Sequence, residues 1–170
     1  MGLRPGRATR KIERPYTRMS RRKPRQSYVV GVPFPKIHQF EMGTKGNYNT
    51  TLDLVAERAV QIRHNALEAS RIVITNYLTK KLGVNFFLKI LIFPHHVIRE
   101  KPIATGAGAD RYSQGMRKSF GKPSALAAQI KEGQMLMKLF VNKEGEKVGR
   151  DALRKAGLKL PTPVKIVVEE

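Results

Sequence analysis

The stretch at residues 100–123 most constrains how this chain can fold. It follows the most strand-like run of the sequence and precedes another apolar run, yet it has no helical or alternating apolar pattern of its own. Pro102 and Pro123 bracket it, and four glycines lie inside it. A loop of this length is uncommon in a compact domain and is usually functional or disordered. Because strands are expected on both sides, we interpret it as an anchored extension of the body and not as a linker.

The charge of the chain indicates a polyanionic partner. The 170 residues include 33 Lys and Arg against 13 Asp and Glu, which gives a formal net charge of +20. Such an excess is too large for an ordinary metabolic enzyme and is typical of proteins that bind nucleic acid. More than half of it lies in the first 25 residues and in the loop. The hydrophobic fraction of 41% and the length favour one globular domain.

Residues 1–27 are predicted to form a basic N-terminal arm that binds RNA. Prolines and a scarcity of apolar residues argue against a helix packed on a core, so the arm alone in water should be disordered. On phosphates its guanidinium groups would gain bidentate contacts and release counterions. A solubilising tail or a localisation signal is the alternative interpretation. The candidate RNA-binding residues of the arm are Arg4, Arg7, Arg10, Lys11, Arg14, Arg18, Arg21, Arg22, Lys23 and Arg25.

Residues 28–170 are predicted to form a single α+β domain that contains the loop. Strands are expected at residues 28–32, 85–93, 95–99, 125–130, 134–141 and 164–168, and a short helix at residues 146–156. This irregular order of strands and helices favours α+β, with a compact mixed sheet and two or three helices, over a regular parallel α/β sheet.

Residues 47–82 are predicted to be helical because they contain neither Gly nor Pro. Apolar residues recur there at steps of three and four, at Leu52, Val55, Ala59, Ile62 and Ala66. Thr50 or Thr51 would cap the first turn, and Asp53 and Glu57 would complement its dipole. One helix of that length is unusual, so we expect two helices or a bend near residues 65–70, with a stop at Gly83.

The sequence offers no chemistry for catalysis. Without cysteine it cannot form disulfides or cysteine-ligated zinc sites, and it suits a reducing cytoplasm. No apolar run is long enough to span a bilayer. Residues 106–111 contain the first two glycines of a dinucleotide fingerprint but lack the third glycine and the following helix. His95 and His96 would point to opposite faces of a strand, one packed and one exposed, which makes a poor metal site. We therefore expect no enzyme, no cofactor and no bound metal.

The loop and its flanks resemble a known family. The motifs are residues 96–99 (His-Val-Ile-Arg), 106–111 (Gly-Ala-Gly-Ala-Asp-Arg), 114–117 (Gln-Gly-Met-Arg) and 120–123 (Phe-Gly-Lys-Pro). Together with agreeing segments along essentially the whole chain, they resemble the ten-e family of large-subunit ribosomal proteins. That family is the archaeal and eukaryotic counterpart of bacterial large-subunit protein sixteen. The sequence ends at Glu170 without the C-terminal extension of eukaryotic members, so the resemblance is to the archaeal type.

The resemblance implies a structural role in translation. Family members have a hammerhead-type α+β body, lie in the cytoplasm within the large subunit, and bind large-subunit rRNA beside neighbouring ribosomal proteins. Their long loop extends toward the peptidyl-transferase centre, between tRNA at the aminoacyl and peptidyl sites. By motif match the tRNA-proximal residues are Lys101, Gly106, Ala107, Gly108, Ala109, Asp110, Arg111 and Tyr112. The rRNA-binding residues of the returning flank are Arg117, Lys118 and Lys122.

Physical reasoning about the loop is compatible with this role. Small side chains at residues 106–109 would leave backbone amides free to approach phosphates, and Arg111 and Arg117 would position the loop by phosphate contacts. Asp110 would either hydrogen bond loop amides or pair with Arg111, and the sequence leaves both open. Two other functions are alternatives: a free RNA chaperone or ribosome-assembly factor, and an RNA-modifying enzyme, for which no catalytic motif is present.

Overall fold

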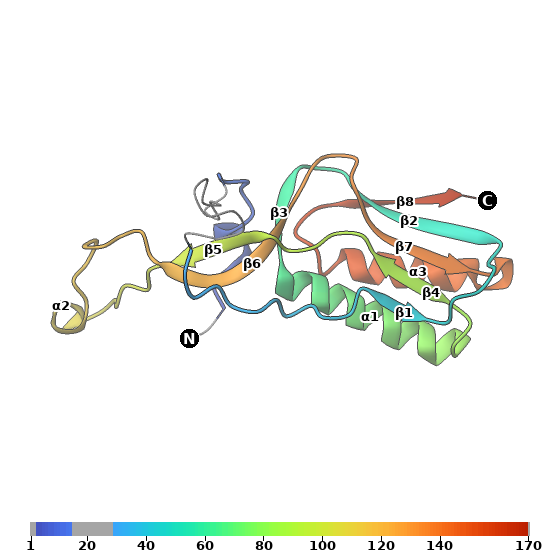
Figure 1. Cartoon of the computed structure of the whole chain (residues 1–170), viewed down its shortest axis with the longest axis horizontal. Helices are drawn as coiled ribbons and strands as arrows, with labels where there is room; N and C mark the ends of the chain where they lie inside the picture. The colour runs from blue at the N-terminus through green and yellow to red at the C-terminus, as the bar shows by residue number, and fades with distance from the viewer. Residues whose placement is uncertain (1–2, 15–28, 170) are drawn as a thin grey trace, which may run out of the picture.

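The computed structural model describes residues 3–14 and 29–169, and it is an α+β fold, as expected from the sequence. Its strands form two antiparallel sheets, one of five strands and one of three. The molecule is elongated (Figure 1). The five-stranded sheet and the two long helices lie at one end, and the smaller sheet leads toward the long loop at the other.

The five-stranded sheet has the strand order β1-β4-β7-β2-β8. Its strands are β1 (Glu41–Gly43), β2 (Thr50–Ala56), β4 (Phe87–Ile90), β7 (Met135–Val141) and β8 (Val164–Glu169). Side chains alternate across this sheet, so that Leu52, Leu88 and Leu139 are fully buried on the face toward the helices. The sheet therefore supplies one wall of the hydrophobic core.

Helices α1 (His64–Leu82) and α3 (Glu146–Gly157) cover that face and supply the other wall (Figure 1). The buried positions of α1 recur at steps of three and four, at His64, Leu67, Ser70, Ile74 and Leu78. Helix α3 packs against α1 and buries the small residues Ala152 and Ala156, while Gly149 lets α3 approach the sheet, because a Cβ atom there would lie 2.6 Å from Leu52 Cδ1. The single hydroxyl proton of Ser70 has two acceptors, the Ala66 carbonyl at 2.9 Å and the Ala156 carbonyl at 3.3 Å, so this buried hydroxyl is satisfied. None of the helices in the described part has the length and apolarity needed to cross a membrane.

The smaller sheet has the order β3-β6-β5 and carries the long loop. Its strands are β3 (Val60–Arg63), β5 (His96–Glu100) and β6 (Lys122–Ile130). Strands β5 and β6 are antiparallel neighbours that end at the pair Glu100 and Lys122, so residues 101–121 are a long hairpin connection. Pro123 is tolerated in β6 because β3 pairs only with residues 127–130, which leaves the N-terminal half of β6 unpaired on that side.

The predicted helix over residues 47–82 is wrong in its first half. Residues 50–56 form β2 and residues 60–63 form β3, and one unbroken helix starts at His64, without the bend expected at residues 65–70. Buried Leu52, Leu54 and Ala56 follow a period of two, because β2 lies between β7 and β8 in the sheet. The C-terminal stop is confirmed, since α1 ends at Leu82 and the Gly83 amide bonds to the Thr79 carbonyl.

The roles predicted for the first turn of that helix are wrong as well. Thr50 and Thr51 are strand residues and cap no helix. Asp53 does not complement a helix dipole, because it lies 2% exposed in the middle of β2 with its carboxylate 3.3 Å from Lys138 Nζ. Burial raises the pKa of the Asp53 carboxyl, and the hydrogen bond and charge of Lys138 oppose that rise.

The remaining element predictions are largely confirmed. Strands β4, β5, β6, β7 and β8 and helix α3 fall within the predicted ranges or within a few residues of them. One histidine is exposed and the other packed, as predicted: His96 is buried at the start of β5, and exposed His95 lies just before the strand. The strand predicted at residues 28–32 is wrong for residues 29–32, which have no regular structure, and residue 28 lies outside the described residues.

Gly43 at the end of β1 gives a direct test of this packing. Its φ is +87°, and a Cβ atom there would lie 2.0 Å from the Phe86 carbonyl oxygen. We expect Gly43→Ala to lower the free energy of unfolding by roughly 2–4 kcal/mol, through backbone strain and separation of β1 from β4. Gly46→Ala is the matched control, because its nearest contact would be an ordinary 3.8 Å. Urea unfolding of both variants measures the difference, and equal stabilities would contradict the predicted contact.

Candidate nucleic-acid interface

The long loop ends in a small tip (residues 106–112) at the far end of the molecule from the two long helices (Figure 1). The tip contains a single helical turn, α2 (Ala109–Tyr112), within the region that the sequence suggested was irregular. The Ala109 and Arg111 amides bond to the Gly106 and Gly108 carbonyls at 3.2 and 3.1 Å. These two backbone amides of the tip are therefore engaged in internal hydrogen bonds. Only the remaining amides of the tip could bind phosphate.

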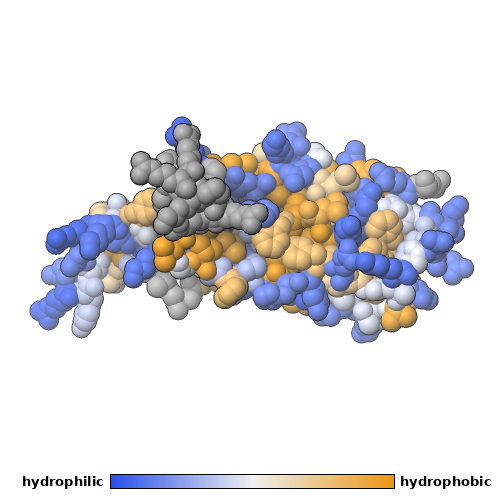
Figure 2. Space-filling view, in the orientation of Figure 1, coloured by the Kyte–Doolittle hydropathy of each residue, from blue (hydrophilic) through white to orange (hydrophobic). Residues whose placement is uncertain are grey.

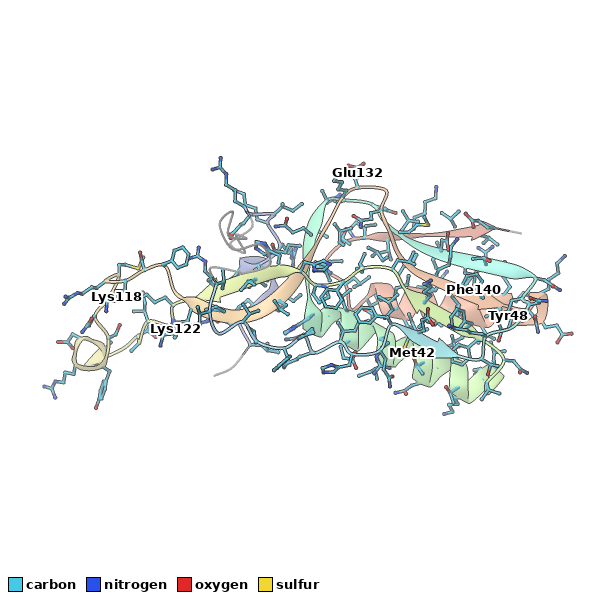
Figure 3. The ribbon with its side chains drawn as sticks, in the orientation of Figure 1. Met42, Tyr48, Lys118, Lys122, Glu132 and Phe140 are labelled. Atoms are coloured by element: carbon cyan, nitrogen blue, oxygen red, sulfur yellow. The ribbon has the colours of Figure 1, made fainter. Side chains whose placement is uncertain are left out.

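Exposed cations follow the loop from its tip to its return. Arg111 lies in α2, and Arg117, Lys118 and Lys122 lie on the returning flank (residues 113–122). All four are exposed, and none is in an ion pair within the described part of the chain. Figure 3 shows Lys118 and Lys122 on the segment that leads from the tip back to β6. In Figure 2 this end of the molecule is mostly hydrophilic. An exposed row of unneutralised cations attracts a polyanion.

Asp110 makes neither of the two contacts considered from the sequence. It is exposed at the start of α2. Among the described residues it has no ion pair with Arg111 and no hydrogen bond to a loop amide. Its carboxylate therefore faces outward with the other tip residues.

Arg99 and Phe120 fasten the base of the loop. Arg99 Nη1 donates a hydrogen bond to the Phe120 carbonyl at 2.5 Å, and the Arg99 guanidinium carbon lies 3.2 Å from the centre of the Phe120 ring. A planar guanidinium can do both at once, which an ammonium cannot. The contact lies next to the last strand pair, Glu100 with Lys122, so it closes the hairpin where the loop begins.

Gly121 lets the two chains of the base come together. Its φ is +76°, and a Cβ atom at this position would lie 2.8 Å from the Glu100 carbonyl carbon and 2.9 Å from its oxygen. Any larger residue would force the outgoing and returning chains apart. The glycine is needed here for close approach of two backbones, as well as for its conformation.

The described part of the N-terminal arm is bound to the smaller sheet. The Gln61 backbone amide donates to the Arg10 carbonyl at 2.9 Å, and Gln61 Nε2 donates to the Thr9 carbonyl at 3.0 Å. Gln129 Nε2 donates to the Glu13 carbonyl at 2.7 Å. The composition of the arm predicted disorder in the absence of RNA. Residues 3–14 are instead held against the smaller sheet by hydrogen bonds that their backbone carbonyl groups accept, and amino-acid composition cannot predict such bonds.

Arg4 links the arm to the loop base. Its side chain pairs with the Glu100 carboxylate, and its carbonyl accepts a 2.8 Å hydrogen bond from Arg63 Nη1. Arg7, Arg10, Lys11 and Arg14 are exposed in the same described part of the arm. The arm and the loop therefore present their cations from the same small sheet. The other candidate residues of the arm, Arg18, Arg21, Arg22, Lys23 and Arg25, lie outside the described residues.

A polar cavity of about 230 Å³ lies between the arm and the loop base. Its lining includes Glu13, Gln61, His96, Arg99 and Lys101. Burial lowers the pKa of the His96 imidazole. The Lys101 ammonium is buried and has no hydrogen-bond partner among the described residues, so a phosphate oxygen in this cavity would satisfy it. Lys101 thus differs from the other tRNA-proximal candidates, because Gly106, Ala107, Gly108, Asp110, Arg111 and Tyr112 are exposed and Ala109 is partly exposed.

The sequence did not identify the residues that hold the interface together. Arg99 and Phe120 occur in the quoted motifs but were given no role, and Gln61, Arg63 and Gln129 were not singled out. The only available signal was an arginine at the end of one strand and an aromatic residue before the next.

Comparison with known proteins assigns the chain to one set of relatives. The family model described as Ribosomal protein L16p/L10e matches residues 14–167. The large ribosomal subunit protein uL16 of Archaeoglobus fulgidus is 47% identical over 172 residues, covering 100% of this chain and 95% of that protein. The uL16 proteins of Staphylothermus marinus and Thermofilum pendens are 46% and 44% identical. Those matches cover 98% and 100% of this chain and 94% and 99% of the respective relatives.

Replacement of Arg99 by lysine tests the loop base. Arg99→Lys keeps the charge but loses the stacked, forked contact with Phe120, worth about 1–2 kcal/mol together. We expect amide hydrogen exchange at Glu100 and Lys122 to rise by roughly 5–30-fold, since 1.4 kcal/mol corresponds to about a factor of ten. Arg111→Lys is the matched control, because Arg111 is exposed in the tip, and it should leave these two amides unchanged. Unaltered exchange in Arg99→Lys would show that Arg99 does not fasten the base.

Proposed function

Because the chain belongs to the Ribosomal protein L16p/L10e family, we propose that it is a structural constituent of the large ribosomal subunit that binds the subunit's rRNA. We propose further that its long loop extends toward the peptidyl-transferase centre and supports the positioning of tRNA at the aminoacyl and peptidyl sites. One observation carries the finer part of this proposal. The loop projects from a fastened base with exposed cations that have no ion-pair partner within the described residues.

Binding to rRNA rests on two groups of cations that share one sheet. Arg7, Lys11 and Arg14 belong to the arm on β3, and the returning flank leads into β6. Folded RNA that lies against this sheet would meet both groups together. Such contacts fix the position and orientation of a protein on RNA without reading base sequence. Neighbouring ribosomal proteins are further partners in an assembly of this kind.

The loop has the reach and the surface for contact with tRNA. With about ten residues on each side, it can extend up to about 30 Å at roughly 3.3 Å per residue. Residues 106–108 have little or no side chain, so RNA can approach the backbone closely. Tyr112 is 89% exposed, and a base could stack on its ring. Peptide-bond formation would remain RNA chemistry, and the protein would contribute placement.

Deletion of residues 102–112 tests the role of the loop. We expect the variant to sediment with large subunits through high salt, since the arm, the body and the returning flank remain. Peptide synthesis by these subunits should be slower, or their tRNA binding weaker. Glu132→Ala is the control, because Glu132 is exposed at the turn between β6 and β7, away from the loop (Figure 3). Full activity of the deletion variant would refute the loop's role, and loss of the full-length chain from subunits at modest salt would favour a free RNA chaperone.

Neutralising the returning flank tests rRNA binding by its salt dependence. The triple variant Arg117→Gln, Lys118→Asn and Lys122→Gln uses asparagine at Lys118, where φ is +55°. Each lost phosphate contact should reduce the slope of log affinity against log salt by about 0.7–0.9, so we expect a reduction of about 2–3 for purified large-subunit rRNA. Lys45→Gln with Lys89→Gln is the control, since both lysines pair with Glu41 on the five-stranded sheet. Equal slopes for the triple variant and the unaltered chain would mean that this flank does not touch phosphate.

A further inference from the structure

The β8 edge of the five-stranded sheet is a surface that neither the loop nor the described part of the arm covers. Strand β8 pairs with β2 along its whole length, from Val164 to Glu169. On its other side no strand of the described part of the chain pairs with it. An edge strand of this length presents a row of backbone donors and acceptors to which another extended chain can be added. Figure 1 places β8 on the large sheet, away from the loop.

A groove runs along this edge between β8 and α3. Its volume is about 590 Å³. Arg150, Arg154 and Leu158, spaced four residues apart, line it from the helix and the turn that follows. Val164 and Ile166 line it from the strand. The two walls are fixed relative to each other, since a Cβ atom on Gly157 would lie 2.6 Å from Val164 Cγ2.

The lining of the groove combines apolar surface with positive charge. Leu158 is 81% exposed, and Pro163 adds to the apolar wall. The lining contains three cations, Arg150, Arg154 and Lys165, and one carboxylate, that of Glu57. Arg150 is partly neutralised by Glu146 at 2.7 Å, whereas Arg154 and Lys165 have no ion pair with any described residue. A molecule that fits here has both apolar groups and negative charge.

We propose that the β8 edge and this groove bind an extended acidic segment of another protein as an added strand. The side chains of an added strand alternate between its two faces. On the face of the added strand toward α3, carboxylates would lie near Arg154 and apolar side chains would contact Leu158. RNA fits less well, because phosphates gain nothing against Leu158, Pro163 and Ile166, and RNA has no peptide backbone to continue the ladder. Given the proposed function, the segment belongs to another protein of the large subunit.

Photo-crosslinking in assembled subunits tests the occupant. The photoreactive amino acid p-benzoylphenylalanine would replace Leu158 in the full chain, and large subunits purified through high salt would be irradiated and analysed by mass spectrometry. We expect a crosslink to a segment of another protein that is rich in Asp and Glu. A crosslink to rRNA, to a basic segment, or to nothing would overturn the proposal. Val84 is the matched control position, since it is an exposed apolar residue, 68% exposed, outside the groove.

Charge reversal separates electrostatic recognition from proximity. Arg154→Glu in the Leu158-labelled chain should lower the crosslink yield at least fivefold, and Arg154→Lys should retain most of it. Lys147→Glu is the control, because Lys147 is an exposed lysine of α3 that does not line the groove. An equal loss of yield in both charge reversals would overturn the role of Arg154.

Hydrogen exchange then tests the added strand itself. A synthetic peptide with the sequence of the crosslinked segment, added to the full chain, should slow amide exchange within residues 164–169. Unchanged exchange there would overturn the added strand. Sedimentation is measured in parallel, so the two proposals fail separately. A chain absent from large subunits contradicts the proposed function, whereas a chain that is present but does not crosslink to an acidic segment contradicts only this inference.

Discussion

The closed base of the hairpin is the constraint on which the interface depends. A loop from residue 101 to residue 121 has large conformational freedom, and its ends must be fixed before its tip has a defined direction. Three features fix them: the last strand pair between Glu100 and Lys122, the Arg99 contact with Phe120, and the close approach that Gly121 permits. Arg4 adds the arm to the same point through Glu100. The direction of the loop, and the placement of the arm's cations beside it, both follow from this small region.

The two sheets contribute differently to the molecule: one forms most of the core, and the other carries the arm and the loop. The five-stranded sheet and helices α1 and α3 contain most of the buried apolar residues, and the buried carboxylate in this sheet is paired, since Lys138 contacts both Asp53 and Glu169. The smaller sheet buries less and carries the arm and the loop, with a group of exposed cations that have no ion pair within the described part of the chain. A body of this kind holds the glycine-containing tip at a distance from the core. The groove beside β8 belongs to the five-stranded sheet and not to the sheet that carries the arm and the loop. Its partly apolar lining suits a protein partner better than RNA.

Much of this arrangement could be predicted from the sequence, and the failures have physical causes. The loop, the strands near residues 125–141 and helix α3 were predicted because their signals are local: prolines and glycines, alternating apolar residues, and a basic last turn. Residues 50–63 were mispredicted because Leu52, Val55 and Ile62 fit a helical period while Leu52, Leu54 and Ala56 fit a strand. Only pairing with strands distant in the sequence decides between them, since β2 pairs with β7 and β8 and β3 pairs with β6. The contact of Arg99 with Phe120 was missed for the same reason, since it forms across the ends of a hairpin and not along one segment.

A density map of the assembled large subunit that contains this chain would show where the loop ends. We expect residues 106–112 to lie at the peptidyl-transferase centre beside the ends of bound tRNA. We also expect rRNA phosphates against Arg117, Lys118 and Lys122 and beside the arm on β3. A tip that points into solvent or into another protein, with no rRNA against the smaller sheet, would refute the proposed placement of the loop.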